Sequence, residues 1–218
     1  MNNITRILMQ GAAGAGGKTY VDDVFSTFLY TGTGSTRSIN NGIDLSGEGG
    51  MTWIKGRSVN YENLLNDTVR GAGNRLRSNT GGASTTGTNW LSAFNSNGFS
   101  LGTDNDVNAN GTTFSSWSFR KSEGFFDVVT YTGTGSARTI SHSLGSVPGC
   151  IMVKRTDATE DWVVYHRGIS DSLGNNPGYY YIYLNTTNPY SAAASRFNNT
   201  AATSTEFSVG TDGGVNAS

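Results

Sequence analysis

Apolar and polar side chains alternate along short runs of this chain, and a period of two residues is typical of β-strands. The alternation predicts strands over residues 114–119, 126–131, 151–154, 162–166 and 179–184. Clusters of Gly, Asn, Asp and Ser separate these runs and indicate turns. Helical patterns of about 10–15 residues, which a parallel sheet needs between its strands, are not found. The pattern therefore predicts an all-β fold.

The chain also repeats itself. Tyr30–Ile39 reads YTGTGSTRSI and Tyr131–Ile140 reads YTGTGSARTI, identical at eight of ten positions. Further matches follow in the same order, namely Gly50–Lys55 with Gly149–Lys154, Phe99–Asp104 with Phe207–Asp212, and Asn108-Ala109 with Asn216-Ala217. Matches that keep their order predict a duplicated domain. A counterpart of residues 162–166 is not recognised in the first copy.

The duplication predicts two tandem β-sandwich modules of a jelly-roll or lectin-like type. The first unit covers residues 30–123 and the second unit covers residues 124–218. Short strands and roughly 95 residues per unit suit a sandwich. An extended Gly/Ala-rich N-terminal arm, residues 1–29, precedes the two units.

The arm has apolar side chains on both sides of a glycine and alanine stretch. Glycine and alanine carry too little side chain to form a core, so the arm is expected to become ordered only against a partner. We therefore predict that its apolar residues attach the protein to another protein or to copies of this chain. These residues are Ile4, Ile7, Leu8, Met9, Val21, Val24, Phe25 and Phe28.

The same stretch nearly matches a phosphate-binding loop. It ends in Gly17-Lys18-Thr19, but the glycine that such a loop needs earlier falls on Ala12. The loop also needs an α/β sheet behind it, which the strand pattern does not offer. We predict no nucleotide site and no cofactor.

The second unit is expected to be short of one strand. After Asn108-Ala109 the first unit continues into the strand of residues 114–119, whereas the second unit reaches Ser218 where that strand would begin. A missing strand leaves an open sheet edge and an uncovered core. The natural protein running on, or a neighbouring chain, would supply it.

Composition narrows the function classes. Charged residues make up 14% of the chain, below the usual quarter, and the net charge is −1. No basic surface for nucleic acid is therefore expected. No apolar run approaches a membrane span and no signal peptide is recognised, so neither a membrane partner nor secretion is expected. The single cysteine, Cys150, lies in an apolar run and is expected to be an inert buried thiol.

Three longer phrases resemble one family. FFDVVTYTGTGSARTISHSLGSVPGCIMVKRTD, EDWVVYHRGI and FSVGTDGGVNAS are similar to the repeated β domain of tail and structural proteins of marine tailed phages, especially cyanophages. The resemblance covers roughly residues 20–218. It implies a virion component, a tail fibre or an associated host-recognition protein, and it brings no catalytic residues with it.

We accordingly expect a non-enzymatic virion structural protein, made in the host cytoplasm, that fastens to the tail through its N-terminus and contributes to host attachment. Its expected partners are other tail proteins, further copies of itself and a host surface glycan. A trimer is expected because tail fibres are usually trimers. The alternatives are a carbohydrate-binding adhesin module and a capsule depolymerase.

One aromatic strand is a candidate ligand site. Alternation places Tyr179, Tyr181 and Tyr183 on one face, for sugar stacking or subunit packing. The opposite face, with Ile182 and Leu184, is expected to be the core.

Three further groups have a chemical and a structural interpretation. Asp104, Asp106 and Asn108 start like a calcium loop, but Trp117 stands where the glutamate should be, so a turn is favoured. His142 and His166 lack an acidic cluster at ligand spacing and are expected to be structural, so no metal is predicted. Asp157, Glu160 and Asp161 could be glycosidase carboxylates, but their loop is expected to be solvated.

Overall fold

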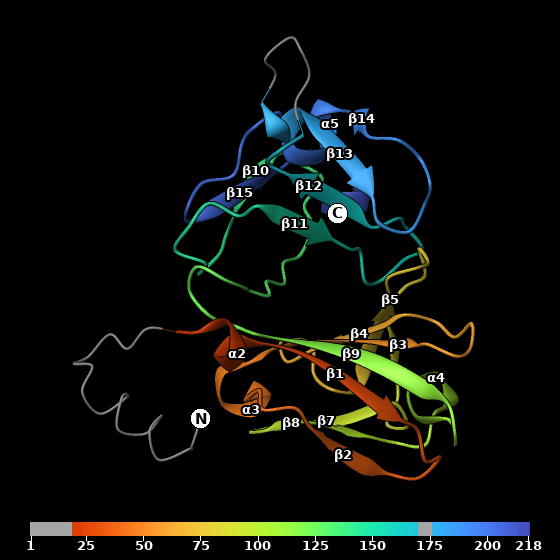
Figure 1. Ribbon diagram of the computed structural model, residues 1–218. Helices are drawn as coiled ribbons and strands as arrows, with labels where there is room; N and C mark the ends of the chain where they lie inside the picture. Colours follow the sequence, from red (N-terminus) through yellow and green to blue (C-terminus); the bar gives the residue numbers. More distant parts are fainter. Residues whose placement is uncertain (1–18, 170–175) are drawn as a thin grey trace, which may run out of the picture.

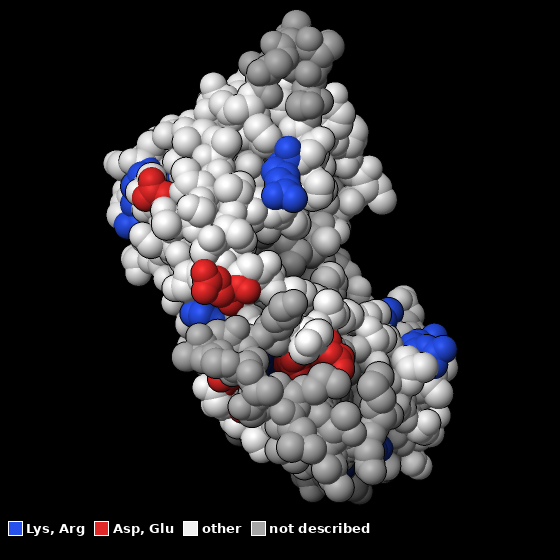
Figure 2. Space-filling model, turned by 60° about the vertical axis from the view of Figure 1, so that its left-hand side comes forward, with Lys and Arg blue, Asp and Glu red and all other residues white. Residues whose placement is uncertain are grey.

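Figure 1 shows the computed structural model, which describes residues 19–169 and 176–218. Antiparallel strands with a few short helices make up the described residues, so the predicted all-β class is confirmed. The molecule has two lobes that meet at a waist, one for each unit (Figures 1 and 2). On the face drawn in Figure 2, charged residues of both signs are scattered and do not form a field of one sign.

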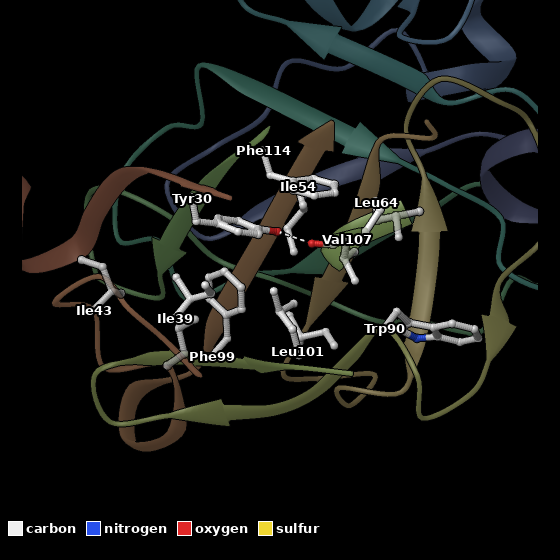
Figure 3. Close-up of a cluster of buried hydrophobic side chains, with 13 residues drawn as sticks. Tyr30, Ile39, Ile43, Ile54, Leu64, Trp90, Phe99, Leu101, Val107 and Phe114 are labelled. Carbon is white, nitrogen blue, oxygen red and sulfur yellow. Dashed lines mark hydrogen bonds between the residues drawn. The ribbon is translucent and has the colours of Figure 1, made fainter. Parts of the chain in front are cut away.

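The first unit contains two sheets. One has the strand order β1-β9-β3-β4-β5-β6 and the other has the order β2-β8-β7. Side chains from both sheets form one buried cluster, with Ile54 and Phe114 from the larger sheet and Phe99 and Leu101 from the smaller one (Figure 3). The elements are α2 (Val21–Val24), β1 (Phe25–Thr31), β2 (Arg37–Asn40), α3 (Leu45–Glu48), β3 (Gly50–Gly56), β4 (Leu64–Asp67), β5 (Asn74–Arg77), β6 (Thr85–Thr86), β7 (Leu91–Asn95), β8 (Gly98–Leu101), α4 (Asn105–Asn108) and β9 (Thr113–Arg120).

The second unit has a four-stranded sheet, β11-β12-β13-β14, and a two-stranded sheet, β10-β15. Its buried cluster includes Val163, Tyr165, Phe197 and Val209. The elements are β10 (Arg138–Ser141), β11 (Cys150–Val153), β12 (Val163–His166), η1 (Pro177–Tyr179), β13 (Tyr180–Tyr183), β14 (Ser191–Ala192), α5 (Ala194–Phe197), β15 (Glu206–Val209) and α6 (Gly213–Asn216).

Strand pairing identifies the counterpart of residues 162–166 that the sequence comparison did not find. Ile54 of β3 pairs with Leu64 of β4, and its counterpart Val153 pairs with Val163 of β12. β12 is therefore the second unit's β4. The sequences LLND and VVYH share little beyond apolar character at their start, so only the register reveals the match.

The first unit starts earlier than predicted. β1 pairs with β9 from Phe25 to Thr31, and Val24 is 2% exposed. Phe28 packs against the first core, while Val21 is exposed. The predicted arm is thus wrong over residues 21–29, because their apolar side chains belong to a short helix and a strand. The other predicted attachment residues lie outside the described residues: Ile4, Ile7, Leu8 and Met9.

The repeated YTGTGS phrase has a structural role in both units. The hydroxyl of Tyr30 donates a hydrogen bond of 2.7 Å to the carbonyl oxygen of Val107, and Tyr131 repeats this with Val215 at 2.6 Å. A side chain at Gly32 could not fit, because its Cβ would lie 2.2 Å from the carbonyl oxygen of Ala109. The YTGTGS phrase therefore holds its own segment of each unit against the short helix near the end of that unit, α4 in the first unit and α6 in the second.

A buried asparagine completes this junction. Asn108 accepts a hydrogen bond from the backbone of Thr33 and donates two, to the carbonyl oxygens of Ser35 and Gly102. Asn216 makes the same three bonds in the second unit, to Thr134, Ser136 and Gly210. Both asparagines are at most 1% exposed. Each one joins two loops that are far apart in the sequence.

The two units pack through an apolar interface. Met51, Leu65 and Leu76 of the first unit form a buried cluster with Trp162 of the second. The indole nitrogen of Trp162 donates a hydrogen bond of 2.8 Å to the carbonyl oxygen of Arg77. Two backbone hydrogen bonds also cross the interface, from Ser84 to Thr156 and from Glu160 to Gly81. The cluster and these bonds fix the units against each other.

We predict that Asn216→Ala, and separately Asn108→Ala, lowers the free energy of unfolding by roughly 3 kcal/mol, because three buried backbone groups lose their partner. Urea denaturation measures this. Asn110→Ala, at an exposed position of the same loop, is the matched control and should change little. A loss below about 1 kcal/mol at both buried positions would contradict the role given to them.

Candidate functional site

A groove of about 590 Å³ lies between residues 125–133 and β11. Its walls carry core side chains of the second unit, namely Tyr131, Ile151, Val153, Phe207 and Val215. Apolar side chains of the unit interface also line it, namely Met51, Leu65, Leu76, Val128, Met152 and Trp162. The groove therefore opens onto two apolar clusters at once.

The same place in the first unit is filled by a strand. There β9 lies between β1 and β3 and pairs with each of them at seven positions. The alignment of Tyr30 with Tyr131 makes residues 126–132 the counterpart of β1, and β11 is the counterpart of β3. Within the described residues, β11 pairs only with β12, and residues 127–134 belong to no strand. Within the described residues, the groove lies where β9 lies in the first unit, and no strand occupies it.

The missing strand leaves apolar side chains uncovered. Met51 of β3 is 7% exposed, whereas Cys150 at the same position of β11 is exposed. The expectation that Cys150 is buried is therefore wrong, although the remaining burial does raise the pKa of its thiol. Val129 is 37% exposed, whereas its counterpart Phe28 packs against the first core. The core side chains Val153, Phe207 and Val215, which line the groove, are at most 7% exposed, so the exposure is confined to residues such as Cys150 and Val129.

Asp127 holds one wall of the groove in place without a ladder of strand hydrogen bonds. Its carboxylate accepts hydrogen bonds from the Lys121 ammonium at 2.8 Å and from the backbone of Val128 and Ser143, at 2.9 and 2.7 Å. Burial raises the pKa of Asp127, but these hydrogen bonds outweigh it and lower the pKa overall. The counterpart in β1 is Ser26, which pairs with Ser118 of β9.

The candidate tyrosines occupy the face opposite to the one predicted. Tyr181 and Tyr183 pack against the core of the second unit, while Leu184 joins the interface between units. The prediction failed because β13 is buried on both faces, so the chemistry of its side chains does not reveal which face is inside. Tyr179 lies in η1, directly before the start of β13.

Arg196 stacks on the two buried-face tyrosines. Its guanidinium carbon lies 5.0 Å from the Tyr181 ring centre and 5.7 Å from that of Tyr183. It also donates a hydrogen bond of 2.9 Å to the Tyr183 hydroxyl and forms an ion pair with Asp212. These tyrosines therefore have protein partners on the face that was expected to meet a ligand.

The first unit contains the same stack with the two residues exchanged. Arg75 lies 3.9 Å from the ring centre of Trp90 and forms an ion pair with Asp104 at 3.8 Å. Strand pairing places Arg75 where the second unit has Tyr181. The carbonyl oxygen of Trp90 accepts a hydrogen bond from the backbone of Gly102, and that of Arg196 accepts the equivalent bond from Gly210. Trp90 is therefore the counterpart of Arg196. Cation and ring have thus exchanged positions between the two units, while the contact and the aspartate partner remain.

The residues that resemble a calcium loop have structural partners. Asp104 caps α4 by accepting a hydrogen bond of 2.9 Å from the Asp106 backbone, and Asp106 lies 3.4 Å from Arg75. Asn108 belongs to the buried junction described above. Among residues 19–169 and 176–218, no group of three or more His, Cys, Asp or Glu side chains could hold a metal ion.

The histidines and the acidic loop also make local contacts. His142 Nδ1 accepts a hydrogen bond from the Leu144 backbone, and His166 Nδ1 accepts one from Gly168. Both bonds close turns. Asp157 pairs with Arg155 at 2.7 Å, and Asp161 accepts a hydrogen bond of 2.7 Å from Asn185. The near match to a nucleotide loop, up to residue 18, lies outside the described residues.

Comparison with known proteins gives one match. The model of a family described as a domain of unknown function, DUF7483, matches residues 21–218. No curated protein and no solved structure matches the chain. In the part of the chain that the structure describes, no helix is long and apolar enough to cross a membrane.

We predict that Asp127→Asn makes the free energy of unfolding depend less on pH in the acidic range. Because the native pKa is lowered, the carboxylate stabilises the fold fully above its unfolded pKa of about 3.9 and loses this effect as the pH falls through the native value. The variant should lose about 1–2 kcal/mol at pH 7 and differ less from the parent at pH 3. Urea titrations at both pH values measure this. Glu48→Gln, which removes an exposed carboxylate, is the control, and an equal pH dependence of parent and Asp127→Asn would contradict the prediction.

We also predict that the exchanged stack can be converted into the arrangement of the first unit. Tyr181→Arg alone adds a second guanidinium beside Arg196, and Arg196→Trp alone removes the partner of Asp212. Each single variant should be destabilised, and the double variant should be more stable than the sum of the two losses by about 1 kcal/mol or more. Denaturant unfolding of the four proteins gives this coupling energy. If the losses of the two single variants simply add up to that of the double variant, the arrangement of the first unit cannot be rebuilt in the second, and the prediction is wrong.

Proposed function

The chain belongs to the DUF7483 family, and we propose that it is a structural protein of a phage virion, a tail fibre or tail-fibre-like component that contributes to host attachment. The proposal begins from the resemblance of its long phrases to tail and structural proteins of marine tailed phages. That resemblance spans roughly residues 20–218, which is nearly the same part of the chain as the family match, residues 21–218.

The observation that carries the proposal is the interface between the units. We interpret the units as tandem β-sandwich modules, and their contact buries Met51, Leu65 and Trp162 in one cluster. Trp162 adds a hydrogen bond to Arg77, and two backbone bonds cross beside it. Modules joined only by a linker would move freely. Modules fixed in this way form a stiff spacer, which an appendage needs to hold a host-contacting end away from the particle.

Attachment to the particle is assigned to the N-terminal residues. The apolar residues Ile4, Ile7, Leu8 and Met9 are proposed to bind another tail protein or further copies of this chain, in a trimer. Residues from Val21 onward belong to the first unit and leave this role to residues 1–18. The protein acts in the virion tail as a binding and structural component, without catalysis.

A second candidate function is direct binding of host surface glycans. It is favoured by Tyr190, which is 55% exposed and lies with its ring centre 5.8 Å from that of Tyr180. Tyr179 also contacts Tyr180 edge-on, with ring centres 5.4 Å apart. Partly exposed aromatic rings suit stacking on sugars. A glycan array with Tyr190→Ala as the matched variant tests this function separately from particle assembly.

We predict that the protein is found in purified particles of the phage that encodes it, and that immunogold labels its tail. Deletion of residues 2–18 should leave both units folded, because β1 and the first core begin after residue 20, but it should prevent incorporation. Mass spectrometry of purified particles and circular dichroism of the truncated protein measure the two results. Particles without the full-length chain, or normal incorporation of the truncated chain, would overturn the proposal or the attachment role, respectively.

A further inference from the structure

The groove beside β11 has two walls, and no strand of the described residues lies between them. In the first unit β9 fills this position and hydrogen-bonds to both neighbours. In the second unit one wall is the free edge of β11 and the other is the segment of residues 126–132, which Asp127 fixes in place. Exposed edges with apolar flanks are templates for a further strand. The groove is therefore preorganised for an extended polypeptide.

We propose that the groove is a docking site for one β-strand with the residue pattern of β9, contributed by a different polypeptide chain. The strand runs antiparallel to both walls and completes the second sheet. This inference concerns the second unit alone and does not depend on the virion function proposed above.

The pairing of β9 fixes the expected register. In the first unit Phe119 lies opposite Phe25 on one side and Met51 on the other. Their counterparts in the second unit are Phe126 and Cys150, so the strand's equivalent of Phe119 lies between these two. At the other end, Phe114 lies opposite Tyr30 and Gly56. The strand therefore enters near Tyr131 and Ser218 and ends near Cys150.

The two faces of the groove set the chemistry of the strand. The inner face meets Tyr131, Val129 and Val153, and its counterpart in β9 carries Phe114, Ser116 and Ser118. The outer face meets Val128 and Met152, and its counterpart in β9 carries Trp117 and Phe119. We expect small or hydroxyl residues to alternate with aromatic ones, because such residues fill the space beneath the sheet and cover the unit interface. Main-chain hydrogen bonds to both walls supply affinity, and the alternate side chains supply specificity.

Neither β9 nor residues 1–18 suit the groove, so the occupant is assigned to a different chain. β9 is committed to the first sheet, where it has a neighbour on both sides. Residues 1–18 contain no aromatic side chain, so they do not reproduce the outer face. The occupant is therefore assigned to another segment, and insertion of residues 1–18 from a second copy is an alternative that the experiment decides.

The test uses the whole chain and a synthetic peptide, GTTFSSWSFRK, which is the sequence of residues 111–121. Saturating peptide should raise the melting temperature by at least about 3 °C, because a ligand that binds only the folded state stabilises it. A peptide of the same composition in scrambled order is the control and should give no shift. No binding of the β9 peptide in calorimetry or in thermal melting would overturn the proposal.

Cys150 allows the register to be tested. A peptide with Cys in place of Phe119 should form a disulfide with Cys150 in the presence of oxidised glutathione, because directly opposite residues are close enough for this bond. A peptide with Cys in place of Ser118 presents its thiol on the inner face and should react at least tenfold more slowly. The Cys150→Ser chain should not be cross-linked. Equal rates for the two peptides would overturn the proposed register.

The oligomeric state separates the proposed occupant from a second copy. The chain should be monomeric by analytical ultracentrifugation at low micromolar concentration, with the groove free for the peptide. An oligomer that blocks the peptide, and that dissociates with recovery of peptide binding when residues 2–18 are deleted, would assign the groove to the N-terminal segment and overturn this part of the proposal.

Discussion

The fold depends on one constraint. Buried backbone groups must find hydrogen-bond partners where the YTGTGS phrase of each unit meets the short helix near the end of that unit, α4 or α6. Asn108 and Asn216 meet this need with three hydrogen bonds each. A side-chain amide offers a donor group with two hydrogens and an acceptor at one point, a combination that no hydroxyl or carboxylate reproduces. The tyrosine of the YTGTGS phrase binds a carbonyl oxygen of this helix. The glycine two residues later leaves room for the residue that follows the helix. The strongest sequence repeat is thus explained by hydrogen bonding and not by a ligand.

The stacked cation and ring show which features the duplicated units preserve. Arg75 on Trp90 and Arg196 on Tyr181 place the charge on opposite partners, yet each arginine reaches the aspartate that caps the following helix. The energy of the contact depends on the pair and not on which of the two positions supplies the cation. An exchange of both residues therefore preserves the packing, whereas a change of one does not. Asp104 and its counterpart Asp212 are kept as helix caps and ion-pair partners, which explains the resemblance to half of a calcium loop.

The sequence predicted the all-β class because alternation and turn residues are local signals. It also located the repeat, in which Asn216-Ala217 aligns with the residues shortly before β9. It did not reveal that β4 and β12 correspond, because their register is a property of pairing and their side chains differ. It assigned Phe25 and Phe28 to an arm, because Val21, Val24, Phe25 and Phe28 stand at helical spacing, which gives no sign of the strand that starts at Phe25. The face of β13 was wrong for a related reason: both of its faces are covered, and only the position of the neighbouring unit decides which one is inside.

The groove follows from the duplication in a way that neither unit shows alone. In the first unit, β1 keeps its extended form because β9 hydrogen-bonds to it along its whole length. Residues 126–132 lack that neighbour, so their conformation must be held by other contacts. Asp127 provides these contacts through Lys121 and Ser143, at the position where β1 has a serine that pairs with β9. Because Val128, Ser143 and Lys121 satisfy the Asp127 carboxylate, this wall is held without a neighbouring strand. The backbone beside β11 is therefore fixed, while no strand of the described residues occupies the position between the two walls. This combination of a fixed backbone and an unoccupied strand position is what a docking strand requires.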